Sequence, residues 1–132
     1  QDSSLPLLER IKGGIEAHFV YVAQNPNLPR FVINEVISHP ERYELVQKRI
    51  GETVGNVYQN LQKDIDQAAK QGDIIYIDVK MLFISIMSLN IFTFIAYPFM
   101  EPLMGDLMTD RQKFLNERKA ENVETILKRL RI

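Results

Sequence analysis

The feature of this sequence that most constrains its fold is a run of twenty residues, Met81 to Met100, that contains no charged side chain. A helix that is apolar on every side is stable only when it is buried, either in a protein core or in lipid. The run is also long enough to cross the hydrocarbon layer of a membrane. The fold prediction therefore depends on what covers this segment.

Lipid is the weaker of the two explanations. Polar residues interrupt the run and a proline lies near its end: Ser85, Ser88, Asn90, Thr93 and Pro98. The other helical segments carry charged faces, which need water. The chain contains no cysteine, which suits a reducing cytoplasm. We therefore expect a cytoplasmic protein that does not interact with a membrane.

A second copy of the chain is the expected cover for the open side of the run. An apolar stripe of this length is larger than the patches that monomers usually expose. The last predicted helix has an apolar face of its own, and two such helices from each of two subunits form a four-helix bundle. The sequence therefore predicts a homodimer with these residues at its interface: Ser85, Ser88, Leu89, Phe92, Leu115, Val123, Ile126, Leu127 and Leu130.

Proline and glycine residues divide the chain into segments in which apolar residues recur every three or four positions, as in helices. Asp78 is a suitable N-cap for the uncharged helix, and Gly72 suits the position just past the end of the helix before it. The sequence predicts one all-α domain over residues 1–132. The last two of its five helices form the intersubunit bundle. The predicted helices are Leu5 to Gln24, Leu28 to Ser38, Pro40 to Gln71, Asp78 to about Tyr97, and Thr109 to Arg131.

Composition and motifs argue against several functions. The formal net charge is −1, so the chain is not predicted to hold nucleic acid by neutralising phosphates. The two histidines, His18 and His39, lack the spacing of metal ligands. The sequence has no glycine-rich phosphate loop and no nucleophile elbow. We expect no catalytic residue, metal or cofactor, and the chain is not predicted to be an enzyme.

Several segments resemble the sensor domain of TetR/AcrR-type transcriptional regulators. The pattern from Asn25 to Leu28, followed by Arg30-Phe31 and Glu35-Val36, is similar to the start of the second sensor-domain helix in that family. The long helix from Glu41 to Lys70 and the Gly72-Asp73-Ile74 turn resemble the next helix and its glycine turn. The last two helices, ending at Val123 to Leu130, resemble the dimerisation pair.

This resemblance implies a bacterial one-component switch. A C-terminal domain of the family dimerises and holds a small, mostly apolar or amphipathic effector between its helices. Binding of the effector shifts the first sensor helix and relieves repression. An N-terminal helix-turn-helix reads operator DNA, and we expect that module to precede Gln1 in the complete protein. Operator DNA is then a partner only through that missing domain.

An effector pocket in a helical bundle is mostly apolar with a few placed polar groups. The candidates are therefore polar residues on buried faces, together with aromatic and methionine residues that could form apolar walls. The predicted ligand-binding group is His18, Phe19, Phe31, Asn34, Glu35, Tyr58, Gln62, Phe83, Met87, Asn90 and Phe94.

Each candidate also has an ordinary structural explanation. The aromatic residues and Met87 could be plain core, Asn90 could form hydrogen bonds across the dimer, and Glu35 could pair with Arg30 or face water. The alternative function is a dimeric all-α protein-interaction module that binds no small molecule. A DNA-reading segment upstream of Gln1 would distinguish the repressor from this alternative.

Overall fold

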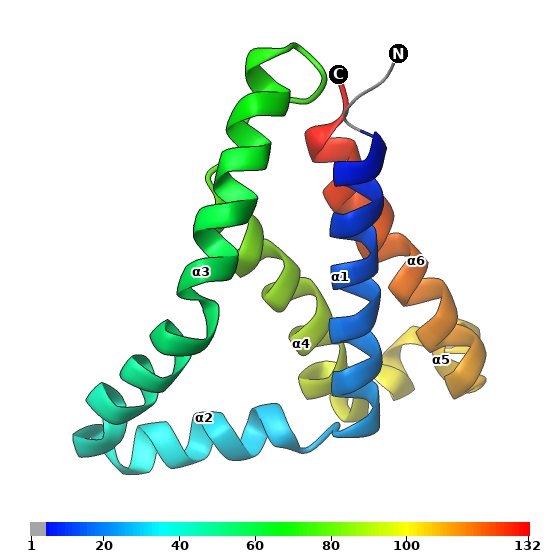
Figure 1. Ribbon diagram of the computed structural model, residues 1–132. Helices are drawn as coiled ribbons and strands as arrows, with labels where there is room; N and C mark the ends of the chain where they lie inside the picture. Colours follow the sequence, from blue (N-terminus) through cyan, green and yellow to red (C-terminus); the bar gives the residue numbers. More distant parts are fainter. Residues whose placement is uncertain (1–4) are drawn as a thin grey trace.

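Six α-helices and one short 3-10 turn account for most of residues 5–132, which are the residues that the computed structural model describes (Figure 1). The described part of the chain contains no strand, so the all-α prediction is confirmed. The elements are α1 (Leu5–Gln24), α2 (Leu28–Ser38), η1 (Pro40–Arg42), α3 (Tyr43–Lys70), α4 (Val79–Met104), α5 (Asp106–Thr109) and α6 (Arg111–Leu130).

The predicted number of five helices is wrong, because a four-residue helix, α5, lies between α4 and α6. The predicted end of α4 near Tyr97 is also wrong. The helix continues through Pro98 and Pro102 to Met104, and it stops at Gly105, whose φ is +58°. A proline removes one helical hydrogen bond and can be accommodated by a local bend, whereas a glycine with positive φ ends a helix more decisively.

Local side-chain and backbone features fix the other boundaries of the last helices. The Asp78 side chain accepts a 2.8 Å hydrogen bond from the backbone nitrogen of Lys80 and begins α4, as predicted. The Asp110 side chain accepts a 3.1 Å bond from the backbone nitrogen of Lys113 and begins α6. Gly72, with φ of +80°, lies just past the end of α3. Such caps satisfy backbone groups that a helix end leaves without partners.

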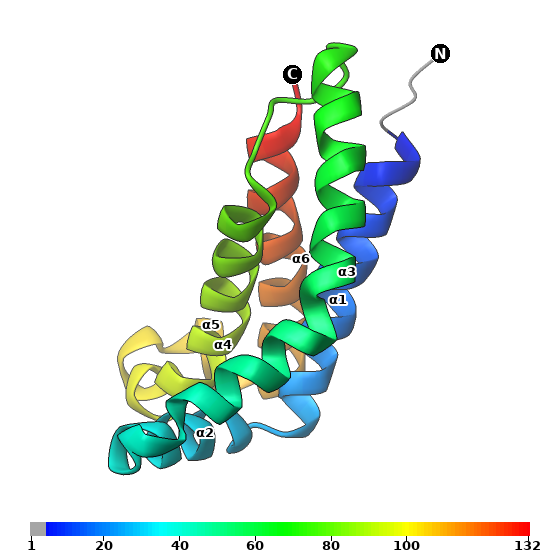
Figure 2. The same ribbon diagram turned by 60° about the vertical axis from the view of Figure 1, so that its left-hand side comes forward.

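Helices α1, α4 and α6 form the body of the domain, and each contacts the other two. Figure 1 shows α1 and α6 side by side, with α3 on the opposite side of α4 from α6. Figure 2 shows that α2 lies across the end of the molecule that is far from the C-terminus. Helix α2 contributes no buried residue, and the buried residues of α3 are Ile65 and Ala68, near its C-terminal end.

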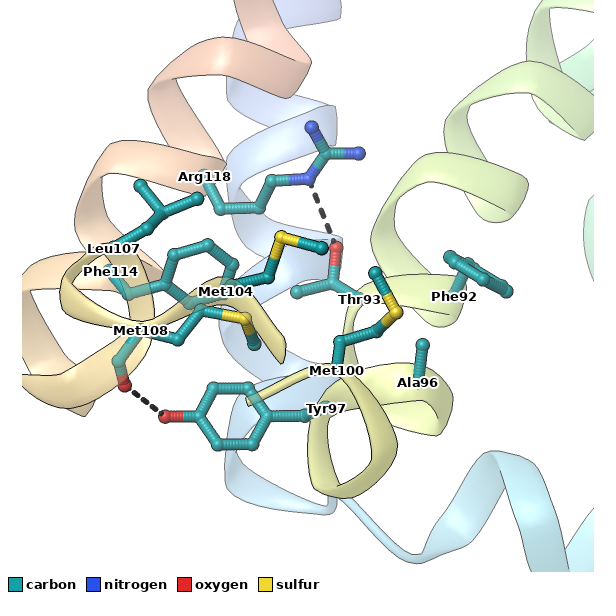
Figure 3. A pocket seen from close by; sticks show the side chains of 10 residues that line it. All are labelled: Phe92, Thr93, Ala96, Tyr97, Met100, Met104, Leu107, Met108, Phe114 and Arg118. Atoms are coloured by element: carbon teal, nitrogen blue, oxygen red, sulfur yellow. Dashed lines mark hydrogen bonds between the residues drawn. The ribbon is translucent and has the colours of Figure 1, made fainter. Parts of the chain in front are cut away.

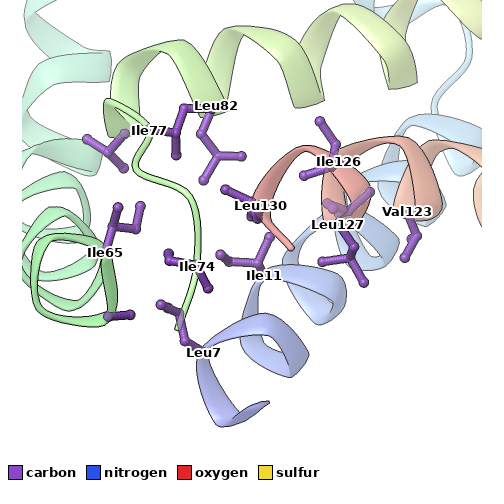
Figure 4. Packing of buried hydrophobic residues seen from close by; sticks show 13 residues of the cluster. Leu7, Ile11, Ile65, Ile74, Ile77, Leu82, Val123, Ile126, Leu127 and Leu130 are labelled. Atoms are coloured by element: carbon purple, nitrogen blue, oxygen red, sulfur yellow. The ribbon is translucent and has the colours of Figure 1, made fainter. Parts of the chain in front are cut away.

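The main hydrophobic core lies between α1, α6, the C-terminal half of α3 and the start of α4 (Figure 4). Ile15, Ile65 and Leu130 are completely buried there. The α3–α4 loop takes part, because Ile74 and Ile77 are buried and the backbone nitrogen of Ile75 donates a 2.8 Å bond to the carbonyl of Leu130. A second cluster surrounds the contact between α1, α4, α5 and α6: Phe19, Val22, Phe94, Met108, Phe114 and Leu115.

Candidate functional site

A partly open cavity of about 490 Å³ lies between α1, α3 and α4. Its walls are mostly apolar, and α4 supplies Leu82, Phe83, Ile86 and Met87 to them. The remaining lining residues come from α1 and α3: Arg10, Ile11, Gly14, His18, Val57, Asn60, Leu61 and Asp64. A cavity of this size with a few polar groups is typical of sites for small organic molecules.

The two charged residues on the cavity wall neutralise each other. The guanidinium of Arg10 on α1 lies 2.6 Å from the carboxylate of Asp64 on α3, and both side chains are about half exposed. An exposed ion pair of this kind contributes little to stability. It does leave the cavity without an unpaired charge among its lining residues.

His18 is a half-buried polar residue on the wall of this cavity. Its Nδ1 is 3.0 Å from the side-chain nitrogen of Asn90, which is fully buried. Burial lowers the pKa of His18, so the neutral imidazole is favoured. Asn90 in turn donates a 3.1 Å bond to the carbonyl of Ile15 and accepts a 2.9 Å bond from the side chain of Asn122 on α6.

Asn122 is a functional candidate that the sequence analysis missed. It is fully buried, and its Oδ1 has no hydrogen-bond partner among the described residues. Asn122 lies one helical turn before Ile126 and therefore shares the apolar face of the last helix. A polar residue on that face was the sequence signal that could have identified it. The chain His18–Asn90–Asn122 therefore joins the cavity wall to α6 through side chains alone.

The structure brings three of the predicted ligand-binding residues, His18, Phe83 and Met87, to the wall of the cavity. Asn90 contacts His18 from behind. Tyr58 is absent from the wall, but its ring meets that of Phe83 edge-on, with centroids 5.3 Å apart. These five residues form one continuous group around the α1–α3–α4 cavity.

The other six predicted ligand-binding residues lie elsewhere. Phe19 and Phe94 pack ring against ring in the second core cluster. Gln62 accepts a 2.8 Å bond from the backbone nitrogen of Val79, so it supports the start of α4. Helix α2 carries the remaining three away from the cavity. These three are Phe31, Asn34 and Glu35. Phe31 and Asn34 are exposed, and Glu35 pairs with Arg42 and not with Arg30.

The predicted interface residues divide into two groups. Phe92 is 62% exposed on the outer side of α4, Ser88 is exposed, and Ser85 and Leu89 are partly exposed. The α6 residues are instead buried within one subunit: Leu115, Val123, Ile126, Leu127 and Leu130. These five were predicted for the dimer interface, but α1 and α4 of the same chain already cover the apolar face of α6.

An apolar stripe remains uncovered along α4. Met81, Ile84, Phe92, Phe99 and Leu103 are all at least 59% exposed, and their spacing places them along one side of the helix. By length and composition α4 could cross a membrane, and 28% of its most apolar 18-residue window is buried inside the subunit. The stripe therefore needs a partner surface or lipid to cover it.

A smaller cavity of about 230 Å³ lies between α4, α5 and α6 on this same stretch of α4 (Figure 3). Three methionines, Met100, Met104 and Met108, form much of its lining. Arg118 donates from Nε to the hydroxyl of Thr93 at 3.3 Å, at the edge of the cavity. The hydroxyl of Tyr97 donates a 3.0 Å bond to the carbonyl of Met108 and ties α4 to α5.

Among residues 5–132, no group of three or more His, Cys, Asp or Glu side chains is placed to hold a metal ion. The ionisable residues of the larger cavity are a paired arginine and aspartate and a neutral histidine. The arrangement therefore supports binding of an organic molecule, and it offers no evident nucleophile with an adjacent base.

One family model matches most of the chain. Residues 8–126 match the family model described as tetracyclin repressor-like, C-terminal domain. Searches of curated proteins and of solved structures found no match. The matched segment includes α4, most of α6 and every lining residue of the cavity between α1, α3 and α4. The chain therefore belongs to the family of tetracyclin repressor-like C-terminal domains.

Proposed function

We propose that this chain is the effector-binding and dimerisation domain of a TetR-type transcriptional repressor. The observation that carries the proposal is the apolar cavity of about 490 Å³ between α1, α3 and α4, which contains a half-buried neutral histidine. The effector is a small, mostly apolar molecule, because α4 lines the cavity with four apolar side chains and the charged residues among its described lining neutralise each other.

Dimerisation is the second part of the proposal. The exposed stripe on α4, with Phe92 near its middle, packs against a second copy of the chain and not against lipid. We place the exposed face of α6, which packs beside α4 within the subunit, next to this contact, so that α4 and α6 of both subunits form a four-helix bundle. A cytoplasmic location follows, because the apolar surface that could attract a membrane is then covered.

Repression would operate through an N-terminal helix-turn-helix that binds operator DNA as a dimer. Such dimers read two half-sites about one helical turn of DNA apart, so a small change in the separation of the two readers weakens binding. Helix α1 is the first element of the domain and supplies Ile11, Gly14 and His18 to the cavity wall. An effector that binds better when α1 is displaced therefore shifts the equilibrium away from the DNA-binding state.

Two glycines on consecutive positions of α1 provide a test with a matched control. A Cβ atom added at Gly13 or at Gly14 would meet no atom within 4 Å, but only Gly14 lines the cavity. Gly14→Leu therefore fills part of the cavity, whereas Gly13→Leu adds the same group to the same helix outside it. The measurement is a fluorescence titration with N-phenylnaphthylamine, an uncharged apolar dye that brightens when it leaves water.

We expect wild-type protein and Gly13→Leu to bind the dye with similar affinity, and Gly14→Leu to bind it at least tenfold more weakly. Circular dichroism and thermal unfolding of both variants check that the helices are intact. Failure of the wild-type protein to bind the dye, or equal binding by both variants, would contradict the assignment of this cavity as the effector site. The interaction module that binds no small molecule would then be the better explanation.

A further inference from the structure

We propose that His18 presents an Nε2–H donor to the effector, so that the effector is an uncharged, largely apolar molecule with one hydrogen-bond acceptor, such as a carbonyl or ether oxygen. This inference rests on the proposed function, because it takes the α1–α3–α4 cavity as the effector site. It adds the chemical class of the ligand and the atom that recognises it.

The orientation of the Asn90 side chain is the first step. Its nitrogen lies 3.1 Å from the carbonyl oxygen of Ile15, which can only accept a hydrogen bond. Its oxygen lies 2.9 Å from the side-chain nitrogen of Asn122, which can only donate. Turning the amide over would set two acceptors against each other at Ile15 and two donors against each other at Asn122. The Ile15 carbonyl, which cannot donate, therefore fixes the orientation with nitrogen toward Ile15, and the bond from Asn122 agrees with it.

The tautomer of His18 follows from that orientation. The same Asn90 nitrogen lies 3.0 Å from His18 Nδ1, and an amide nitrogen donates and does not accept. Nδ1 must therefore carry a lone pair, which places the proton of the neutral ring on Nε2. Protonation of Nδ1 would bring a second N–H toward the donor of Asn90, so the contact also opposes the charged form of the ring.

The Nε2–H group is free to bind a ligand. No described residue provides a hydrogen-bond partner for Nε2, since the contact of His18 is made by Nδ1. Among the described residues, the side-chain polar atom that is both buried and without a partner is Oδ1 of Asn122. Because His18 Nε2 also lacks a partner, it must retain accessible surface. Because His18 lines the cavity, the donor is within reach of a molecule that occupies it.

The charge balance of the cavity selects between kinds of acceptor. A carboxylate would also accept a bond from Nε2–H, but it would lose its hydration against apolar side chains such as Phe83 and Met87. The one cation on the wall, Arg10, is already paired with Asp64 at 2.6 Å. Among the described lining residues no unpaired positive charge remains to compensate a buried anion, so an uncharged acceptor fits the site better.

The tautomer can be measured without any ligand. The chain has two histidines, so a long-range proton–nitrogen NMR correlation spectrum contains two imidazole patterns, and a His39→Gln variant assigns them. At pH 7.5 we expect His18 to show a protonated Nε2 and an unprotonated Nδ1. A protonated Nδ1, or an imidazolium ring at this pH, would overturn the inference.

The ligand class is tested with three competitors of similar length for bound N-phenylnaphthylamine. They are methyl heptyl ketone, the alkene in which a methylene group replaces its carbonyl oxygen, and nonanoate. One hydrogen bond corresponds to a preference of roughly three- to tenfold for the ketone over the alkene in wild-type protein. We expect nonanoate to compete more weakly than the ketone.

Two variants of His18 separate the donor from the shape of the side chain. His18→Leu removes the donor, and we expect the ketone and the alkene then to compete equally. His18→Gln can accept from Asn90 through its oxygen and donate through its nitrogen, so it restores the preference for the ketone. The preference is the ratio of ketone to alkene competition within one protein, so it does not depend on how tightly each variant binds the dye.

The outcomes distinguish this inference from the proposed function. If the wild-type protein binds the dye but shows no preference between ketone and alkene, the cavity is retained as a site and the role of His18 is wrong. The same conclusion holds if nonanoate is the strongest competitor, or if His18→Leu keeps the preference. If the dye does not bind the wild-type protein, the proposed function fails, whereas the tautomer measurement still stands by itself.

Discussion

Asn122 on α6 donates a 2.9 Å hydrogen bond from its side chain to Oδ1 of Asn90 on α4, at a point where both side chains are completely buried. This bond lies between two apolar clusters, where most helix contacts are hydrophobic. An amide pair in such surroundings fixes how two helices are aligned, because a shifted register would leave both groups without partners. Through His18 the same bond connects the cavity to α6, which we place next to the dimer contact.

The first prediction concerns this amide pair. Asn90→Leu leaves the Asn122 amide buried without an acceptor, and Asn122→Leu leaves Asn90 Oδ1 without a donor. Each single change is expected to lower the free energy of unfolding by about 1–3 kcal/mol. The double variant removes both partners, so it is expected to lose less than the sum of the two single losses.

Urea unfolding at one fixed protein concentration measures these differences, because the stability of a dimer depends on concentration. Losses that simply add in the double variant would show that the two amides do not depend on each other. The alignment that we assign to the pair would then have to come from the surrounding apolar contacts.

The second prediction distinguishes the core from the surface of the subunit. Leu130→Ala removes a completely buried side chain and is expected to lower the free energy of unfolding by about 2–5 kcal/mol. Leu45→Ala on α3 removes the same atoms from a side chain that is 59% exposed, and it is expected to change stability by less than about 0.5 kcal/mol. Equal losses in denaturant unfolding would contradict the burial of α6 within its own subunit.

The third prediction tests the dimer. Phe92 on α4 and Phe31 on α2 are exposed to nearly the same extent, 62% and 63%. A glutamate at position 92 would bury a charge in the proposed contact between subunits, so Phe92→Glu is expected to sediment as a monomer of about 15.4 kDa. Phe31→Glu is expected to sediment with twice that mass, as the wild-type protein does.

Sedimentation equilibrium without detergent gives these masses directly. A monomeric wild-type protein would show that α4 is not covered by a second copy. A wild-type protein that needs detergent to stay in solution would favour lipid as the cover.

The fourth prediction is a pH dependence that originates in His18. Burial lowers the pKa of this group below its ordinary value of 6.5, so the unfolded chain takes up the proton at a higher pH than the folded chain. The contribution of His18 to the free energy of unfolding is therefore complete above about pH 6.5. It decreases as the pH falls from 6.5 toward the lowered pKa.

Urea unfolding of wild-type protein and His18→Gln between pH 8 and pH 5 measures this contribution. The stability of the wild-type protein relative to the variant is expected to fall as the pH decreases through this range. A difference that stays constant with pH would mean that His18 has the same pKa in the folded and unfolded chain.

Most of the fold could be predicted because its signals are local. The bounds of α1 and α2 agree with the sequence prediction, and Asp78 caps α4 as expected, since periodicity and capping act within a few residues. Helix α5 was missed because four residues are too short to show a helical period. The end of α4 was misplaced because the sequence shows where a proline lies but not how the segment around it packs.

The site was only partly predictable, because a side chain's neighbours depend on how the helices are placed. His18 and Asn90 stood out as polar residues in apolar surroundings, and the structure joins them. Phe31 has the same apolar character as Phe83, yet α2 holds Phe31 at the surface while α4 places Phe83 at the cavity. No periodicity within either helix distinguishes these two outcomes.

The unequal anchoring of the helices has a consequence for ligand selection. The buried residues of α3 lie in its C-terminal part, and α2 has none, so these two helices are held to the domain mainly at one end. Helices α1 and α4 contribute buried residues along much of their length, whereas the N-terminal half of α3 has none. If the cavity is the effector site as we propose, we expect it to accept molecules of different bulk through movement of the N-terminal part of α3, with chemical selection made by α1 and α4.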